Sequence, residues 1–187
     1  FDTMRSAAST QTLPDTLHLQ WVRTNPRVQP AFNSRRLQFD AGYEPVVMNK
    51  TLFVGSPIND SVSAIDIDTG AEKWTVYTDG PVRFAPVAWP DRVFAASDDG
   101  CLYCLDADTG KPLWTFRAVP SQRKIIGNGR LMSVWPIRGG PVLEDGRIYF
   151  AAGIWPFEGI FVYALDAHTG DVIWRNDRSG SLYLGHP

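Results

Sequence analysis

The residues of this chain that could do chemistry form three small groups. Cys101 and Cys104 make a C-x-x-C, a spacing that can hold a metal ion or form a disulfide. His168 could ligate a metal or accept a proton near neutral pH. The neighbouring carboxylates Asp98 and Asp99 could bind calcium or act in acid–base catalysis. Which of these roles is open depends on the elements that carry the residues.

One eleven-residue phrase occurs three times in the chain. It reads small residue, aliphatic residue, Asp, two variable residues, Thr, Gly, three variable residues and Trp. The copies are "AIDIDTGAEKW" (64–74), "CLDADTGKPLW" (104–114) and "ALDAHTGDVIW" (164–174). Recurrence at about 40 residues, with a longer gap before the third copy, indicates an array of similar supersecondary units.

Each phrase is preceded by two short runs rich in Val, Phe, Tyr and Ile, with a turn between them. These runs lie in 45–56, 85–97 and 140–153. A third strand ends at the Asp of the phrase, and a fourth strand, after the turn, carries its Trp. Each unit therefore has four strands, which is typical of a propeller blade. We therefore predict an all-β fold, a partial β-propeller of three complete four-stranded antiparallel blades. The predicted blades are 43–78, 82–118 and 139–176, with an insertion at 119–138.

The phrase has a physical reason to recur. A four-stranded blade cannot bury both of its faces alone, so each blade must be covered by its neighbour. Asp, Thr and Gly at fixed offsets favour a tight turn, and the large indole after that turn can dock on the adjacent blade. The predicted docking residues are Asp66, Gly70, Trp74, Asp106, Gly110, Trp114, Asp166, Gly170 and Trp174.

Alignment of the three units argues against the chemical roles considered first. Cys104 occupies a small-residue core position, and Cys101 should face the other side of the same strand, about 10 Å away between Cα atoms, so both are predicted to be structural thiols. His168 falls in the turn of the phrase, and Asp98 and Asp99 fall in a predicted hairpin turn. No residue is therefore assigned to catalysis or to a metal ion.

The departures from the repeat are the best functional lead. Residues 117–140 hold five basic residues and no acidic one, and 153–159 lengthen a turn in the third blade. Both segments should border the same mouth of the propeller, where enlarged loops commonly bind ligands. The candidate residues for an anionic ligand or a partner are Arg123, Lys124, Arg130, Trp135, Arg138 and Trp155. The alternative is that the two loops only pack on each other as a lid.

The two ends of the chain do not fit the repeat. Residues 17–24 resemble an orphan outer strand in which Trp21 stands where the other units have their Trp, and 25–42 read as a linker. We expect 1–16 to be irregular or disordered and 179–187 to begin a further blade. Because three blades do not close a propeller, we expect the chain to be part of a longer protein, partnered by its remaining blades or by another protein.

Composition excludes several classes of function. A formal net charge of −2 gives no reason to expect nucleic-acid binding. The apolar runs are much shorter than the roughly 18 to 20 residues of a membrane-spanning helix. The chain begins with Phe1 and shows no signal segment, and its two cysteines leave the redox compartment open.

The phrase resembles the tryptophan-docking motif of the pyrroloquinoline-quinone-type (PQQ-like) β-propeller repeat family. The match covers residues 43–178 in three copies and departs only at Cys104, where the family has a small residue. WD40 repeats would need a Trp-Asp pair and kelch repeats a Gly-Gly in each blade, and neither pattern recurs here. "GNGRLMSVWPIRGGPV" and "AAGIWPFEGIFVYALD" further resemble stretches of large exported bacterial PQQ-like repeat proteins.

The resemblance implies two functions. Some members are BamB-like non-catalytic proteins, which favours an exported scaffold or binding module, in the periplasm or at the cell surface, that binds a protein partner or small anion at its loop-rich face. Others are quinoprotein dehydrogenases with PQQ and calcium, so a fragment of such an enzyme is the alternative. The dehydrogenase cofactor residues cannot be assigned in this sequence, and we favour the binding module.

Overall fold

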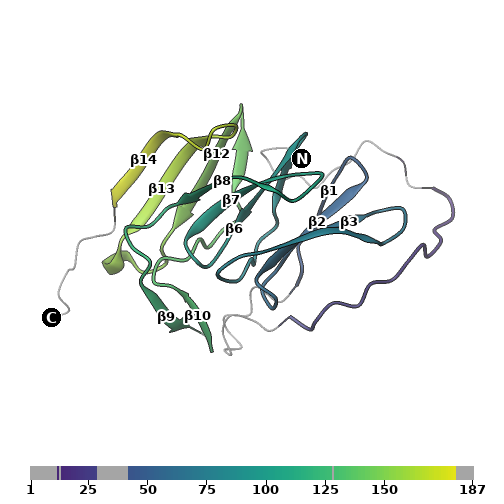
Figure 1. Cartoon of the computed structure of the whole chain (residues 1–187), viewed down its shortest axis with the longest axis horizontal. Coiled ribbons are helices and arrows are strands. Elements are labelled where there is room, and N and C mark those ends of the chain that lie inside the picture. The colour runs from purple at the N-terminus through teal and green to yellow at the C-terminus, as the bar shows by residue number, and fades with distance from the viewer. Residues whose placement is uncertain (1–11, 13, 29–41, 128, 180–187) are drawn as a thin grey trace.

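The computed structural model of the chain describes residues 12, 14–28, 42–127 and 129–179. It contains three four-stranded sheets and one two-stranded sheet, and every pair of neighbouring strands is antiparallel. In each four-stranded sheet the strands follow chain order, so each sheet is an up-and-down blade. Figure 1 shows the three blades side by side, which confirms the predicted all-β fold.

The blades have the following strands. Blade 1 consists of β1 (Val46–Met48), β2 (Thr51–Ser56), β3 (Ser61–Asp66) and β4 (Glu72–Tyr77). Blade 2 consists of β5 (Val87–Trp89), β6 (Arg92–Ala96), β7 (Cys101–Asp106) and β8 (Pro112–Arg117). Blade 3 consists of β11 (Val142–Glu144), β12 (Arg147–Ala152), β13 (Ile160–Asp166) and β14 (Val172–Ser179). A 3-10 turn, η1 (Pro156–Glu158), precedes β13.

The insertion between blades 2 and 3 is not a plain loop. It forms a two-stranded ribbon of β9 (Lys124–Gly127) and β10 (Arg130–Ser133). In Figure 1 this ribbon projects beyond the end of blade 2.

The repeated phrase produces the same irregularity in every blade. In blade 1, Trp74 pairs with Ala64 and Glu72 pairs with Ile65, so Lys73 is an extra residue in the outer strand. The same register shift lies between Cys104 and Leu105 and between Ala164 and Leu165. Because a bulge bends the strand and redirects its side chains, it sets each indole at a similar angle to its sheet.

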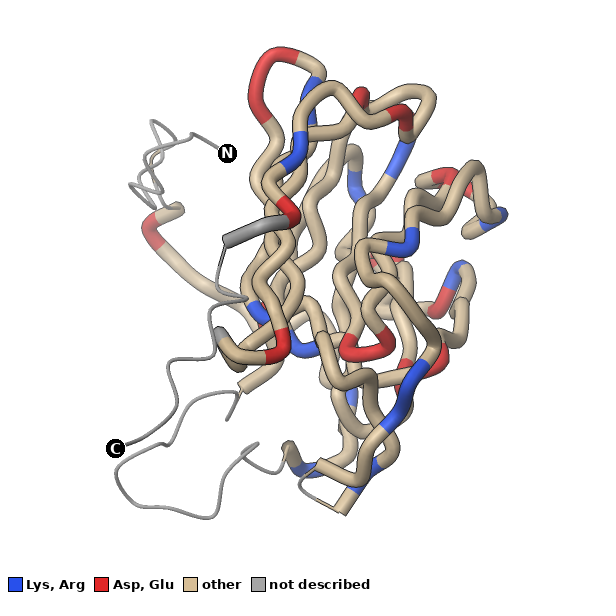
Figure 2. Tube along the Cα trace, turned by 90° about the vertical axis from the view of Figure 1, so that its left-hand side faces the viewer, with Lys and Arg blue, Asp and Glu red and all other residues tan. Residues whose placement is uncertain are grey.

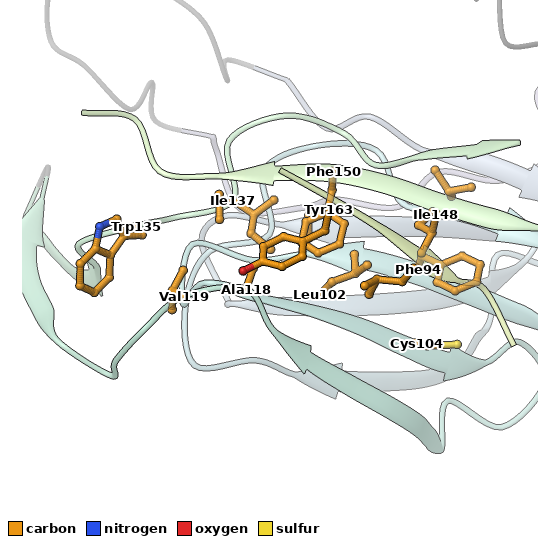
Figure 3. Close-up of a cluster of buried hydrophobic side chains, with 14 of the residues drawn as sticks. Phe94, Leu102, Cys104, Ala118, Val119, Trp135, Ile137, Ile148, Phe150 and Tyr163 are labelled. Carbon is orange, nitrogen blue, oxygen red and sulfur yellow. The ribbon is translucent and has the colours of Figure 1, made fainter. Parts of the chain in front are cut away.

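Two apolar layers hold the blades together. Blade 2 is covered on both faces, and all five residues of β6 are buried. Figure 3 shows the layer between blades 2 and 3, where Phe94 and Leu102 face Ile148, Phe150 and Tyr163. The Phe150 and Tyr163 rings stack with centroids 5.6 Å apart. Burial of apolar surface between blades is therefore the main force that joins them.

The segment before blade 1 differs from its prediction. We expected a strand over 17–24, but the described residues 14–28 form no strand. A strand needs a neighbour to take up its backbone hydrogen bonds, and none of the described strands pairs with this segment. Residue 179, expected to begin a further blade, is instead the last residue of β14 and pairs with Ile160. Residues 1–11, 13, 29–41 and 180–187, which cover most of the other predicted end segments, lie outside the described residues.

Candidate functional site

The two ends of the blades are built differently. We call the end that holds the turns of the repeated phrase, residues 66–70, 106–110 and 166–170, the turn end. In blade 1 the Asp66 carboxylate accepts hydrogen bonds from the Thr69 hydroxyl and amide, both at 2.9 Å, and from the Asp68 amide at 3.0 Å. The Thr69 hydroxyl bond is the main cause that lowers the pKa of Asp66. Gly70 has a φ of +72°, which other residues rarely adopt. Asp66 and Gly70 thus shape the turn of blade 1.

Two of the docking indoles, Trp74 and Trp114, lie on the turn of the next blade. Trp74 packs over Gly110, where an added Cβ would come within 2.7 Å of the indole, and its Nε1 donates to the carbonyl of Ala107 at 3.0 Å. Trp114 packs over Gly170 and donates to the carbonyl of His168 at 3.1 Å. Glycine in the turn thus permits both the positive φ and the close contact of the indole ring.

Trp21 docks in the same way although its segment is not a strand. Its indole packs over Gly70, and Nε1 donates to the carbonyl of Ile67 at 2.7 Å. Trp174, at the other end of the array, is 51% exposed. The analogy between Trp21 and the repeat therefore holds for the side chain and fails for the backbone.

The cysteines and His168 have structural surroundings. Both Cys101 and Cys104 are free and buried, and burial raises the pKa of each thiol to about 12. The His168 ring packs on Trp89 with centroids 4.7 Å apart, while Arg92 donates to the His168 carbonyl at 3.0 Å. Among the described residues no group of three or more His, Cys, Asp and Glu side chains gathers as a metal site would require.

The opposite end, here called the loop-rich end, comprises residues 57–60, 78–86, 97–100, 118–141 and 153–159. Its centre is Asp98, which we expected to be a simple turn residue but which is only 1% exposed. The Asp98 carboxylate lies 2.7 Å from Nε of Arg83 and 2.9 Å from Nε of Arg138. Burial of a carboxylate is tolerable here because two guanidinium groups flank it.

Asp99 behaves more like the predicted turn residue. Its carboxylate accepts hydrogen bonds from the amide of Cys101 at 2.8 Å, the amide of Asp79 at 3.2 Å and the hydroxyl of Tyr103. Burial, with the nearby Asp99 charge as the second cause, raises the pKa of Tyr103. This carboxylate closes the hairpin and links it to the connection from blade 1.

Arg130 ties the β9–β10 ribbon to blade 1. Its guanidinium donates to both carboxylate oxygens of Asp60 at 2.6 Å, and to the carbonyls of Pro57 at 2.6 Å and Ile58 at 2.9 Å. The ion pair with Arg130 lowers the pKa of Asp60, but burial raises it by more. The pKa of Asp60 therefore lies above its usual value. Arg130 is therefore a structural anchor in this arrangement.

Arg123 and Trp135 join the insertion to the enlarged turn of blade 3. Arg123 pairs with Glu158 at 2.8 Å, and its guanidinium lies 5.7 Å from the centroid of the Trp135 ring. The buried Trp135 also donates from Nε1 to the Glu158 carbonyl at 2.5 Å and meets Phe161 edge to face. The two enlarged loops thus pack on each other, as the lid alternative predicted.

The insertion runs over the end of blade 2. The amide of Ser133 donates to the carbonyl of Asp98 at 2.8 Å, and the amide of Ile137 donates to the carbonyl of Ser97 at 3.2 Å. With Arg130 on blade 1 and Arg123 on blade 3, this segment contacts all three blades. We call residues 118–127 and 129–138 the strap.

The strap exposes apolar side chains. Ile126 and Leu131 face each other across the β9–β10 register and are 81% and 56% exposed. Trp155 and Phe157 on the enlarged turn of blade 3 are also exposed and stack with ring centroids 5.9 Å apart. Lys124 is exposed at the start of β9. The exposed aliphatic pair was not predicted from the sequence, although the two adjacent residues Ile125 and Ile126 in the insertion were a usable signal.

The candidate residues therefore do not form one cluster. Arg123 and Trp135 lie together, Arg130 and Arg138 each bind a different carboxylate, and Lys124 and Trp155 face solvent. Figure 2 shows acidic and basic positions interspersed along the described chain, in keeping with these pairings. Among the described residues no helix is long and apolar enough to cross a bilayer.

Comparison with known proteins agrees with this architecture. A quinohemoprotein alcohol dehydrogenase of Comamonas testosteroni is 30% identical over 158 residues, covering 76% of this chain and 21% of that protein. The outer membrane protein assembly factor BamB of Yersinia pestis is 31% identical over 94 residues, covering 50% of this chain and 22% of that protein. The chain therefore spans about a fifth of the length of these relatives.

A solved structure shares the fold. A europium-containing methanol dehydrogenase superposes with a TM-score of 0.58 at 22% identity, covering 71% of this chain and 24% of that one. A family model described as outer membrane protein assembly factor BamB matches residues 11–133 and 90–184. The recurring turn, the docked indoles and this match agree, and the chain belongs to that PQQ-like β-propeller repeat family.

Proposed function

We propose that this chain is a non-catalytic binding module that recognises a protein partner at its loop-rich end. The observation that carries the proposal is the exposed pair Ile126 and Leu131 on the strap. Exposed apolar side chains gathered on one surface are typical of protein–protein contact sites. Trp155 and Phe157 add aromatic side chains, which are frequent in such contacts.

The support beneath this surface favours recognition without rearrangement. Arg130 fastens the strap to Asp60 of blade 1, and Arg123 fastens it to Glu158 of blade 3. A surface held in place before contact loses less conformational entropy on binding than a free loop. The arginines predicted to bind a ligand therefore serve the site mainly by holding its frame.

Charge at the edge of the surface should influence how the partner is attracted. Lys124 is exposed next to the aliphatic pair, and Arg123 is only partly covered by its pairing with Glu158. A partner with acidic residues around an apolar centre suits this arrangement, and its binding should weaken as salt screens the charges. Changing Lys124 to Gln, which leaves the Arg123–Glu158 pair in place, should slow association and reduce its salt dependence.

A crosslinking experiment tests the proposal in the full-length protein. A photoreactive residue replaces Ile126 on the strap, and a matched control places it at Asp108, which is exposed at the turn end. We expect a discrete protein adduct from position 126 in the producing cells and little or none from position 108. Equal adduct patterns from both positions would contradict the proposal.

A second function, part of a PQQ- and calcium-dependent dehydrogenase, is favoured by the quinohemoprotein relative. Calcium is held by several oxygen ligands, and no group of three acidic, His or Cys side chains gathers among the described residues. The full-length protein should be incubated with PQQ and Ca²⁺ and assayed for retained quinone and dye-linked alcohol oxidation. Turnover would favour this second function over the first.

Export is part of the proposal. The name of the Yersinia pestis relative places that protein in outer-membrane assembly, and the same compartment is proposed for this chain. Fractionation of the producing cells should find the full-length protein outside the cytoplasm, and a cytoplasmic location would contradict this.

A further inference from the structure

The outer face of blade 1, which points away from blade 2, differs from the matching faces of the other blades. Ser63 lies between Val54 and Thr75 in the sheet register. The same position holds Tyr103 in blade 2 and Tyr163 in blade 3. In those blades the ring packs within an apolar layer between sheets. Serine at this position carries a hydroxyl in place of the ring.

A cavity of about 130 Å³ lies beside Ser63 on this face. Side-chain hydroxyls dominate its lining, contributed by Tyr43, Ser56, Ser61, Ser63, Thr75 and Tyr77. The hydroxyls of Ser63 and Thr75 bond to each other at 2.8 Å. A hydroxyl has one donor and two acceptor positions, so most of this capacity is left for a guest.

The chain segment before blade 1 borders the cavity on the side away from the sheet. Trp21 anchors the segment on the blade 1 turn, and Arg23 pairs with Glu72 at 2.6 Å. The Tyr43 hydroxyl donates to the carbonyl of Pro26 at 2.7 Å. Arg23 and Glu72 are the charged residues in the described lining, and their charges cancel. The cavity is therefore polar, neutral and bounded on two sides.

We propose that this cavity binds a small neutral polyol of three or four carbon atoms. Its volume corresponds to about four water molecules at about 30 Å³ each, which sets the size of the guest. A polyol replaces those waters with hydroxyls that both donate and accept, as the lining requires. Neither an anion nor an apolar molecule would match a neutral, hydroxyl-rich wall.

The test uses saturation-transfer NMR on the full-length protein, observed on the ligand. Erythritol and glycerol are the probes, and propan-1-ol and glycolate are the comparison molecules. For so few atoms we expect half-saturation at about millimolar concentration for the two polyols. We expect no saturable signal from propan-1-ol or glycolate.

Three variants locate the site. Ser63→Tyr supplies the ring that blades 2 and 3 have at this position and should abolish the erythritol signal. Thr75→Val keeps the shape of the side chain, removes one hydroxyl and should weaken binding by about fivefold. Thr115→Val, the same change at the matching exposed position of blade 2, should have no effect.

The outcomes separate cleanly. The proposal stands if the polyol signal saturates and disappears in Ser63→Tyr. It further requires that the signal weakens in Thr75→Val and is unchanged in Thr115→Val. It is wrong if no polyol signal saturates, or if Ser63→Tyr and Thr75→Val both bind erythritol as the parent does. Circular dichroism of each variant checks that the fold is kept, and Thr75→Val decides the matter if Ser63→Tyr does not fold.

Discussion

The turn end and the loop-rich end of these blades cap the same strands by opposite means. At the turn end one Asp-x-x-Thr-Gly turn is used three times, and each turn receives an indole from the preceding segment. At the loop-rich end the connections do not repeat one pattern, and each basic side chain meets a different carboxylate. Arg138 meets Asp98, Arg130 meets Asp60 and Arg123 meets Glu158.

The difference shows which features the fold requires and which it leaves free. Neighbouring blades meet in the same geometry each time, so the same turn and docked indole recur at each junction. The connections at the loop-rich end do not form this repeated contact, so they can vary in sequence and shape. Stability should therefore depend on repeated residues at one end, and binding on residues that occur once at the other.

Removal of a docked indole should give the largest loss of stability. Trp74 is buried between blades 1 and 2, whereas Trp174 is half exposed. We expect Trp74→Ala to lower the free energy of unfolding by about 4 kcal/mol because it leaves a cavity between the blades. Trp174→Ala should cost less than about 1 kcal/mol. Urea unfolding measures both, and equal losses would contradict indole docking as the source of stability.

The buried ion cluster tests whether the loop-rich end also contributes to stability. Asp98→Ala would leave Arg83 and Arg138 buried beside an empty position, at a cost of about 3 kcal/mol. Asp68→Ala is the control, because it breaks only the exposed pair with Lys50, which is worth less than about 1 kcal/mol. Thermal unfolding of both variants is the measurement. A loss no larger for Asp98→Ala than for the control would show that the cluster is dispensable.

Two glycines separate backbone strain from indole contact. Gly110 and Gly129 have φ values of +72° and +76°, but only Gly110 has an indole within 4 Å of an added Cβ. We expect Gly129→Ala to cost about 1 kcal/mol from strain alone. Gly110→Ala should cost about 2 to 3 kcal/mol because the methyl group also displaces Trp74. Matching losses in urea unfolding would mean that the ring does not rest on the turn.

Acid should affect the two ends in opposite directions, with small effects. Hydrogen bonds from Thr109 lower the pKa of Asp106 in the folded protein below 3.8, its value in the unfolded chain. The ionised carboxylate therefore stabilises the fold. This contribution is complete above pH 3.8 and is lost as the pH falls through the folded pKa. Burial raises the folded pKa of Asp60, so stability gained at that site increases as pH falls towards 3.8.

Two variants separate these contributions. Thr109→Val should raise the pH at which acid unfolding begins, whereas Asp60→Asn should leave that pH unchanged or lower it. Circular dichroism between pH 6 and 2 follows both. An unchanged acid transition in Thr109→Val would refute the role of the threonine hydroxyl.

The sequence predicted what is local and repeated. Three blades, the turn formed by Asp66 and Gly70, and the buried free cysteines all follow from an eleven-residue pattern whose interactions lie within a few residues. Docking of Trp74 was also accessible, because the repeat itself implies a neighbour of the same kind.

Contacts between distant residues could not be predicted. Asp98 looked like a turn residue because its partners Arg83 and Arg138 are 15 and 40 residues away. Arg130 looked like a free cation because Asp60 is 70 residues away. Residues 17–24 alternate like a strand, yet pairing depends on a neighbour that their own sequence does not reveal.

The most direct test of the account changes both ends in one assay. A photoreactive residue at position 155 reports partner binding, and urea unfolding reports stability, in Ile126→Ser/Leu131→Ser and in Asp106→Ala/Thr109→Ala. We predict that the strap variant loses the crosslinked product at an unchanged unfolding midpoint. The turn variant should lose stability and keep the yield of product per folded molecule. Full crosslinking in the strap variant, or an equal loss of yield in both, would contradict the division between the two ends.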